Sequence, residues 1–258
     1  MKGLGVCLII VAGASLASAQ GRLIVCGDEW SLSDYAFTNN AASTNAFANN
    51  VAQQLIGSSG SILRKSNNGL FNGTTLATTL TTAGYSFTTD TSTTFTLAQL
   101  QAYDAVFLAG AIGRADVAAN LTALTTYIVG GGSVYLACGT GDFGNAAAES
   151  AAWNSLTSLY GISIGGAWID PSSTLNVTVD AGVHPLHAGV TTFTYGWGHD
   201  ISVTSGATVA LRGGPELSQN IGLVAMTNSP VPEPITMALG TMGLGAAYRR
   251  RRASRKQS

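Results

Sequence analysis

The sequence predicts an α/β fold built on a doubly wound, mainly parallel sheet, and three observations support this prediction. Short continuous apolar runs end in glycine, as at residues 23–27, which is typical of buried parallel strands. Segments with apolar residues at helical spacing separate these runs and give a strand–helix–strand rhythm. Residues 20–228, roughly 210 in number, suit one domain.

The first half of the chain follows this rhythm. Phe47, Val51 and Leu55 recur every four residues and predict a helix, and Gly84 ends a second one. Strands are expected at 23–26, 61–63 and 85–89, and helices over 44–56 and 74–83.

The clearest unit lies in the middle of the chain. Val117, Leu121, Leu124 and Ile128 share one face of a predicted helix, and three glycines end it. The unit consists of a strand, helix, strand and helix at 104–110, 116–129, 133–139 and 146–160. After Gly161 only strands are expected, and they either extend the sheet or form a small antiparallel layer on its edge. They lie at 175–179, 190–195, 201–203, 208–211 and 221–226.

The first nineteen residues have the three parts of a secretory signal peptide. Lys2 supplies a positive charge, residues 4–12 form a short apolar run, and Ala17-Ser18-Ala19 supplies small residues for cleavage. The run is too short for a membrane-spanning helix, which needs about 20 residues. We therefore expect signal peptidase to remove residues 1–19, so that the mature chain begins at Gln20. A buried N-terminal strand is the alternative.

The other end of the chain has three parts in a fixed order. Two prolines hold the first part extended, and it reads Val231, Pro232, Glu233 and Pro234. The apolar residues 235–248 can just cross a thin bilayer as a transmembrane helix. A basic cluster then marks the cytoplasmic side, and it consists of Arg249, Arg250, Arg251 and Arg252.

This order resembles the PEP-CTERM sorting signal, and the expected sorting segment is 229–258. The resemblance implies that an exosortase, a membrane enzyme, processes the segment, which the apolar helix holds in the inner membrane beforehand. It also implies delivery to the cell envelope, outer surface or extracellular matrix of a Gram-negative bacterium. Exopolysaccharide or other surface proteins are the partners that this location suggests.

The charge of the predicted mature body argues against nucleic acid as a partner. Residues 20–228 contain five basic and twelve acidic residues, a net charge of about −7. Such a surface does not attract phosphate groups. An arginine cluster directly behind an apolar helix is typical of a membrane boundary rather than of a nucleic-acid-binding tail. No cofactor and no metal site are predicted.

Three segments of the body together resemble the class I glutamine-amidotransferase-like fold. They are residues 27–30 after the first strand, residues 103–110, and the strand that leads from the glycine triplet to Cys138. His184-Pro185-Leu186, followed by Gly189-Val190, is similar to later loops of that superfamily. The resemblance implies one amidotransferase-like or flavodoxin-like domain over 20–228, with extra C-terminal strands.

Cys138 lies where that family keeps its nucleophile. The family pattern has glycine two residues before and after the cysteine and a later His-x-Glu, whereas this chain has Leu136, Thr140 and no His-x-Glu. We therefore interpret Cys138 as a buried core residue and predict no catalytic residue. The usual strand order of the fold places the strand 104–110 between those of Cys26 and Cys138. Both thiols should then be about 9–10 Å apart, free and buried.

Three carboxylates, Asp28, Glu29 and Asp34, follow the first strand at the edge where doubly wound folds bind ligands. They can coordinate a hard cation such as Ca²⁺, although solvated side chains are the simpler interpretation. We treat them as a possible ligand edge. Nearby aromatic residues are interpreted as core, with a sugar-stacking surface as the alternative, and these are Trp30, Tyr35 and Phe37.

Two further patterns are typical of cofactor sites but are interpreted otherwise. Residues 139–144 match Gly-x-Gly-x-x-Gly, yet that fingerprint follows a first strand and precedes an acidic residue by about 20 positions, so a tight turn is expected. Zinc requires defined ligand geometry, so we expect separate turn and surface roles for its candidate ligands His184, His187, His199 and Asp200.

Together these observations predict a non-enzymatic exported protein of the envelope or matrix, whose sorting signal is its main functional feature. The alternative is an exported enzyme or carbohydrate-binding module that uses the carboxyl edge of the sheet.

Overall fold

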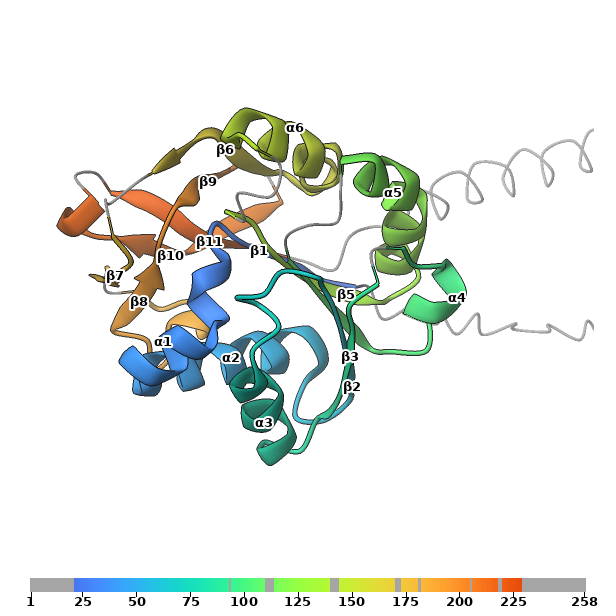
Figure 1. Ribbon diagram of the computed structural model, residues 1–258, viewed down its shortest axis with the longest axis horizontal. Helices are drawn as coiled ribbons and strands as arrows, with labels where there is room; N and C mark the ends of the chain where they lie inside the picture. The colour runs from blue at the N-terminus through green and yellow to red at the C-terminus, as the bar shows by residue number, and fades with distance from the viewer. Residues whose placement is uncertain are drawn as a thin grey trace, which may run out of the picture.

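Seven strands form the central sheet of the molecule, in the order β10-β11-β1-β5-β4-β2-β3 (Figure 1). The computed structural model describes residues 21–92, 94–109, 114–139, 144–169, 173–180, 182–204, 206–217 and 220–228. The parallel strands are β1 (Leu23–Cys26), β2 (Ser61–Lys65), β3 (Ser86–Asp90), β4 (Ala105–Ala109) and β5 (Ser133–Ala137). The antiparallel strands are β10 (Ala207–Gly213) and β11 (Ile221–Thr227). Every residue of β1, β4 and β5 is buried, because helices cover both faces of a parallel sheet.

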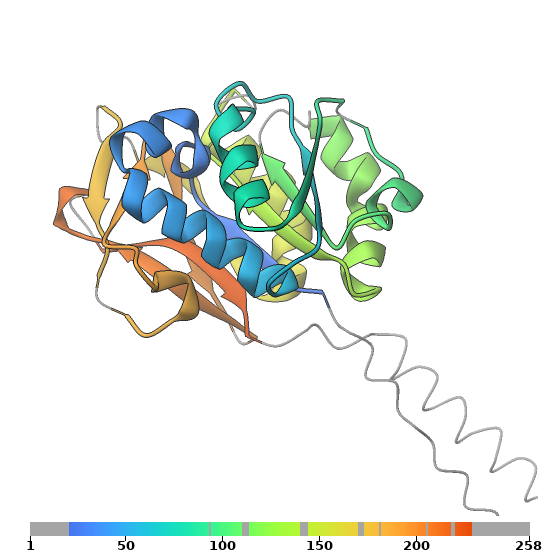
Figure 2. The same cartoon turned by 90° about the horizontal axis from the view of Figure 1, so that it is seen from below.

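Helices form a layer on each face of the sheet (Figures 1 and 2). One layer packs against Ile24 and consists of α1 (Asp34–Asn39), α2 (Ala41–Ile56) and α3 (Thr74–Thr82). The other packs against Val25 and consists of α4 (Leu97–Leu100), α5 (Arg114–Val129) and α6 (Ala146–Thr157). Neighbouring strand residues thus supply two separate apolar clusters, because successive side chains point to opposite faces.

The C-terminal part adds two small antiparallel pairs beside the sheet. The first pair is β6 (Ile162–Ile169) with β9 (Gly198–Val203), and the second is β7 (Leu175–Thr178) with β8 (Thr192–Tyr195). Four short 3₁₀ turns complete the described elements: η1 (Glu29–Leu32), η2 (Ser158–Tyr160), η3 (Pro185–His187) and η4 (Pro215–Leu217). The two alternatives for the C-terminal strands therefore both occur, since some strands extend the sheet and others form separate layers.

The predicted α/β class with a mainly parallel sheet is confirmed, and most predicted elements are present with shifted ends. Sequence reasoning missed α1, which Ser33 caps, and α4, which Thr96 caps. It also missed β6, where Ile162 and Ile164 alternate with polar residues but two glycines interrupt the pattern. Short helices and glycine-containing strands carry too few periodic residues to be recognised.

The predicted strand order is wrong, because β5 lies directly beside β1. Val25 is opposite Leu136, and Cys138 N–H donates to Cys26 O at 2.9 Å. Both thiols are nevertheless free and buried, as predicted. The reason is register: Cys26 is opposite Ala137, so Cys138, one residue further on, belongs to the apolar cluster on the other face of the sheet.

Both ends of the described chain lie at the edge where the parallel strands begin. Gly21 N–H donates to Ile128 O at 3.3 Å, and Leu23 N–H donates to Thr227 Oγ1 at 3.3 Å. The predicted signal peptide and sorting segment lie outside the described residues. Within the part that is described, no helix combines the length and apolar character that a membrane span requires.

Candidate functional site

The candidate site lies at the carboxyl ends of β1 and β5. The chain leaves β1 toward the layer of α1 and α2 and leaves β5 toward the layer of α6, so these neighbouring strand ends open between two helical layers. Doubly wound folds place ligands where adjacent connections separate in this way. Buried ionisable side chains gather here, and they are Cys26, Asp28, Glu29, Cys138, Glu149 and His199.

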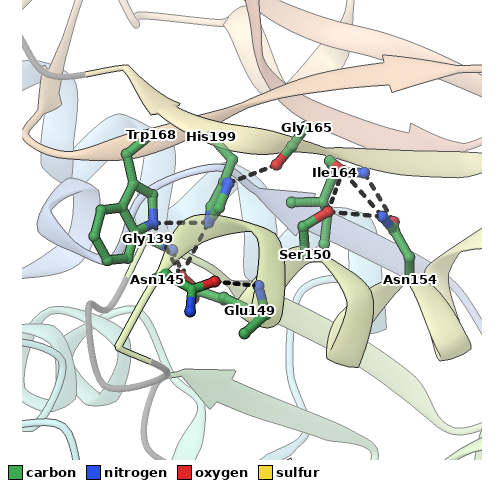
Figure 3. Close-up of polar contacts among 10 residues, drawn as sticks. Gly139, Asn145, Glu149, Ser150, Asn154, Ile164, Gly165, Trp168 and His199 are labelled. Carbon is green, nitrogen blue, oxygen red and sulfur yellow. Dashed lines mark hydrogen bonds and ion pairs between the residues drawn. The ribbon is translucent and has the colours of Figure 1, made fainter.

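Glu149 of α6 and His199 of β9 form a fully buried pair (Figure 3). His199 Nε2 lies 2.9 Å from Glu149 Oε2, and His199 Nδ1 lies 2.7 Å from Gly165 O. Trp168 Nε1–H donates to Glu149 Oε2 at 3.3 Å and also lies 3.1 Å from His199 Nε2. Glu149 Oε1 accepts the Gly139 N–H at 2.9 Å. The pair therefore joins the end of β5 to α6, β6 and β9.

The distances around this pair limit it to two protonation forms. A carbonyl oxygen only accepts, so Nδ1 of His199 must carry a proton to bond Gly165 O. Nε2 and the Glu149 oxygen are too close to be two bare acceptors, so a further proton lies between them. The pair is then an imidazolium beside a carboxylate, or a neutral imidazole beside a carboxylic acid. In both forms its net charge is zero, which suits its complete burial.

The sequence places Glu149 through the start of α6. Asn145 precedes the helix, and its Oδ1 accepts the Ala148 N–H at 2.8 Å. This cap starts the helix so that Glu149 falls in its first turn, where a negative charge is favourable. The carboxylate then faces the Gly139 N–H at the end of β5.

His199 reaches the site because β9 crosses the end of β1. His199 N–H donates to Gly27 O at 2.8 Å. A Cβ at Gly198 would lie 2.7 Å from that same oxygen, so the crossing requires glycine at this position. The glycine allows the close approach that brings the imidazole beside the Trp168 Nε1–H and onto Glu149.

Asp28 is the second buried acid of the site, and backbone groups hold it. Its Oδ1 accepts the Trp30 N–H at 2.9 Å, and its Oδ2 accepts the Gly196 N–H. Burial raises the pKa of Asp28 to about 7, although both hydrogen bonds favour the charged form and act in the opposite direction. In the described part of the chain no ion pair reaches this carboxyl group.

The predicted ligand edge does not form one cluster. Asp28 and Glu29 are buried, so the interpretation that they are solvated is wrong. Asp34 points elsewhere, since its two carboxylate oxygens accept the Thr74 and Thr75 N–H groups at the start of α3. The described residues contain no group of three or more His, Cys, Asp or Glu side chains that could hold a metal ion.

Cys138 is completely buried, as its interpretation as a core residue predicts. Burial raises the pKa of its thiol well above the usual value, and the charge of Glu149 raises it further. The imidazole of His199 bonds Glu149 and Gly165, and among the described residues no side chain forms a hydrogen bond with the thiol. A thiolate nucleophile needs the opposite environment, with a base or cation beside it.

His184 and His187 lie in turns, as expected, whereas the turn or surface role expected of His199 is wrong because its side chain is fully buried beside Glu149. His184 Nδ1 accepts the Leu186 N–H at 3.2 Å and caps η3, and His187 Nε2 lies 2.7 Å from Asp180 O.

In the glycine-rich turn, Gly139 has a φ of 82°, a conformation that favours glycine. Its N–H already bonds Glu149, so it does not point to a phosphate site. Residues 140–143 of the motif lie outside the described residues.

The aromatic residues after β1 divide between the core and the surface. Phe37 is buried in the core, as expected. Tyr35 is 42% exposed, so its interpretation as a core residue is wrong, and Trp30 is partly exposed. The Trp30 and Tyr35 rings meet edge to face, with centroids 5.5 Å apart. Trp197, in the turn between β8 and β9, is 48% exposed and was not recognised from the sequence.

Glu149 and Trp168 are the site residues that sequence reasoning missed. Glu149 is the only charged residue in α6, between alanines and other small or apolar residues. A single charge in such a helix is a usable signal, because charged residues are rarely buried without a partner. Trp168 gives no such signal, since its position depends on how β6 pairs with β9.

The comparison with known families matches residues 230–252 to the PEP-CTERM protein-sorting motif. This match confirms the sorting signal predicted from Val231 to Arg252 and indicates an exported protein that depends on an exosortase. The motif also implies a location at the bacterial cell envelope or surface. Comparisons with curated proteins and with solved structures gave no match. The resemblance of the body to amidotransferases therefore stays a prediction.

Proposed function

We propose that this chain is a non-enzymatic protein of the outer envelope or matrix, which an exosortase releases from the inner membrane. The match at residues 230–252 carries the proposal, because the extended motif, apolar stretch and arginine cluster follow one another in the order that sorting requires. The signal peptide at residues 1–19 supplies the preceding export step, and the mature chain begins at Gln20.

The absence of catalysis in the body is supported by the arrangement of its one nucleophile candidate. Cys138 is buried with a raised thiol pKa, and the nearby imidazole is engaged by Glu149 and Gly165. Glu149 and His199 are themselves fully buried, so they connect four elements of the fold rather than face a substrate. These contacts favour a structural role for the buried cluster.

Mass spectrometry of the protein in a bacterium with and without its exosortase tests the proposal. We expect envelope protein that starts at Gln20 and lacks Arg249–Arg252, and an unprocessed form in the inner membrane when the exosortase is absent. Replacing the four tail arginines by glutamine should impair processing, whereas Arg212→Gln, an exposed arginine of the body, should not. Mature envelope protein that keeps the intact arginine cluster would contradict the proposal.

A further inference from the structure

Three aromatic residues occupy the surface beside the buried site. Trp30 lies in η1, Tyr35 in α1 and Trp197 in the turn between β8 and β9, and all three are partly or well exposed. We propose that these residues, here called the aromatic edge, bind a neutral polysaccharide. The proposal specifies a partner for the exported protein and in that respect rests on the proposed function.

The buried carboxylate of Asp28 fixes the aromatic edge. It accepts the N–H of Trp30 with one oxygen and the N–H of Gly196 with the other, so it ties η1 to the turn that carries Trp197. Gly196 also packs against the indole, since a Cβ there would lie 2.6 Å from Trp30 Cδ1. The Tyr35 ring contacts the same indole at an interplanar angle of 90°. These contacts fix the position of Trp30, and a pre-positioned ring lowers the cost of binding a partner.

The chemistry of the aromatic edge favours a partner without charge. Among the described residues that follow β1, the acids are engaged inside the fold: Asp28 and Glu29 are buried, and Asp34 accepts two N–H groups of α3. Its exposed polar neighbours on α1 are Thr38 and Asn39, which carry a hydroxyl and an amide. Electron-rich ring faces attract the C–H groups of a sugar ring, while hydroxyl and amide groups bond sugar hydroxyls.

The position of the aromatic edge suits a partner outside the cell. It lies at the carboxyl ends of the parallel strands, whereas Gly21 and Asn228 lie at the opposite edge. The sorting segment follows Asn228 in the sequence. The sorting segment is therefore attached at the edge opposite the aromatic edge, and its removal by the exosortase leaves the aromatic edge in place on the released protein.

Affinity electrophoresis of the full chain tests this proposal, with amylose, cellulose derivatives and dextran as neutral probes and polygalacturonate and dextran sulfate as anionic probes. We expect a neutral probe to retard the protein. Tyr35→Ala and Trp197→Ala should each weaken that binding about five- to tenfold, since each removes one stacking ring, and Trp197→Phe should restore most of it. Leu159→Ala removes an exposed apolar side chain of η2 instead and serves as the matched control.

Three results would overturn the proposal: no neutral probe retards the protein, retardation is the same in Trp197→Ala, or only anionic probes bind. Concentration-dependent self-association that Trp197→Ala abolishes would also overturn it, because the aromatic edge would then be an interface between copies. Thermal unfolding of each variant shows that the fold is retained. Processing by the exosortase is measured separately and should be unchanged in Trp197→Ala. Failure of polysaccharide binding is therefore distinguishable from failure of exosortase-dependent sorting.

Discussion

Two regions at the same edge of the sheet hold buried charge in different ways. At the end of β2, Lys65 Nζ lies 2.7 Å from Asp90 Oδ2, and Gln99 Nε2–H donates to the same oxygen at 2.7 Å. Burial acts to raise the pKa of Asp90. Hydrogen bonds from Lys65, Ser92 and Gln99 nevertheless hold this pKa well below its usual range. At the end of β1, burial raises the pKa of Asp28 to about 7, and the two backbone N–H groups that bond the carboxyl group offset this only in part.

The two regions differ in whether water can solvate the group that remains when its charged partner is removed. The Asp90 side chain is 26% exposed, so water can solvate it without Lys65. Glu149 and His199 are both fully buried, so each depends on the other and on the Gly139, Gly165 and Trp168 groups. A buried pair contributes little net stability when it is intact, yet its loss leaves an uncompensated polar group. The cluster at β1 and β5 should therefore be the more sensitive of the two regions.

Glu149→Ala should produce the largest loss of stability. The substitution removes the Glu149 carboxylate from the His199 imidazole and leaves the Gly139 N–H without its acceptor in a dry site. We expect the free energy of unfolding to fall by about 3–5 kcal/mol, measured by urea denaturation. Lys65→Met is the matched substitution in the other region and should cost about 1 kcal/mol, because Asp90 stays partly solvated. Equal losses in the two variants would contradict the comparison.

The pH dependence of stability should differ in sign between the two regions. Asp28 has a raised pKa in the folded state, so that state retains a proton that the unfolded chain loses at lower pH. The contribution of Asp28 to the free energy of unfolding therefore falls by roughly 2–4 kcal/mol as pH rises from about 4 to about 7, and it levels off above that pH. Asp90 has a lowered pKa, so its contribution is present above about pH 4 and is lost in more acidic solution. Unfolding curves between pH 3 and 8 measure both effects.

Asp28→Asn isolates the first of these effects. The amide oxygen can accept one backbone N–H, but the amide nitrogen then faces the other, so two donors meet in a buried position. We expect the variant to lose about 1–3 kcal/mol at pH 5. This deficit should shrink by pH 8, because the asparagine does not titrate whereas the wild-type carboxyl group becomes charged. A deficit that is constant across this range would show that Asp28 does not titrate there.

The fold was predictable where the pattern is local. The alternation of apolar runs and periodic segments predicted the parallel strands and α2, α3, α5 and α6. The strand order was not predictable, because Cys26 and Cys138 lie in equally apolar strands and nothing local distinguishes neighbours from strands two positions apart. The order followed from a family resemblance, and the chain departs from it.

The candidate site was predictable only in part. Asp28 and Glu29 were recognised because they follow a buried strand, where ligand edges form. Their burial was not foreseen, because β8 and β9 return across the end of β1 from a distant part of the chain: the Gly196 N–H bonds Asp28, and the His199 N–H bonds Gly27 O. The role of Glu149 depends on the contact between α6 and β9, which no local sequence pattern indicates.

Cys138→Ala should have the smallest effect of the substitutions considered. The thiol lies in the apolar cluster between the sheet and α6, so its removal leaves a small cavity and costs about 1 kcal/mol.

The wild-type thiol of Cys138 should also react slowly, because burial and the nearby Glu149 charge both disfavour the thiolate. We expect a thiol-reactive probe at neutral pH to label the folded protein more slowly than a free cysteine peptide, and mass spectrometry assigns the labelled residue. Cys26 is an internal control, since burial raises its pKa to about 11 on the other face of the sheet. Faster labelling of Cys138 than of the peptide would identify an activated nucleophile, and the enzymatic alternative would then replace the proposed function of the body.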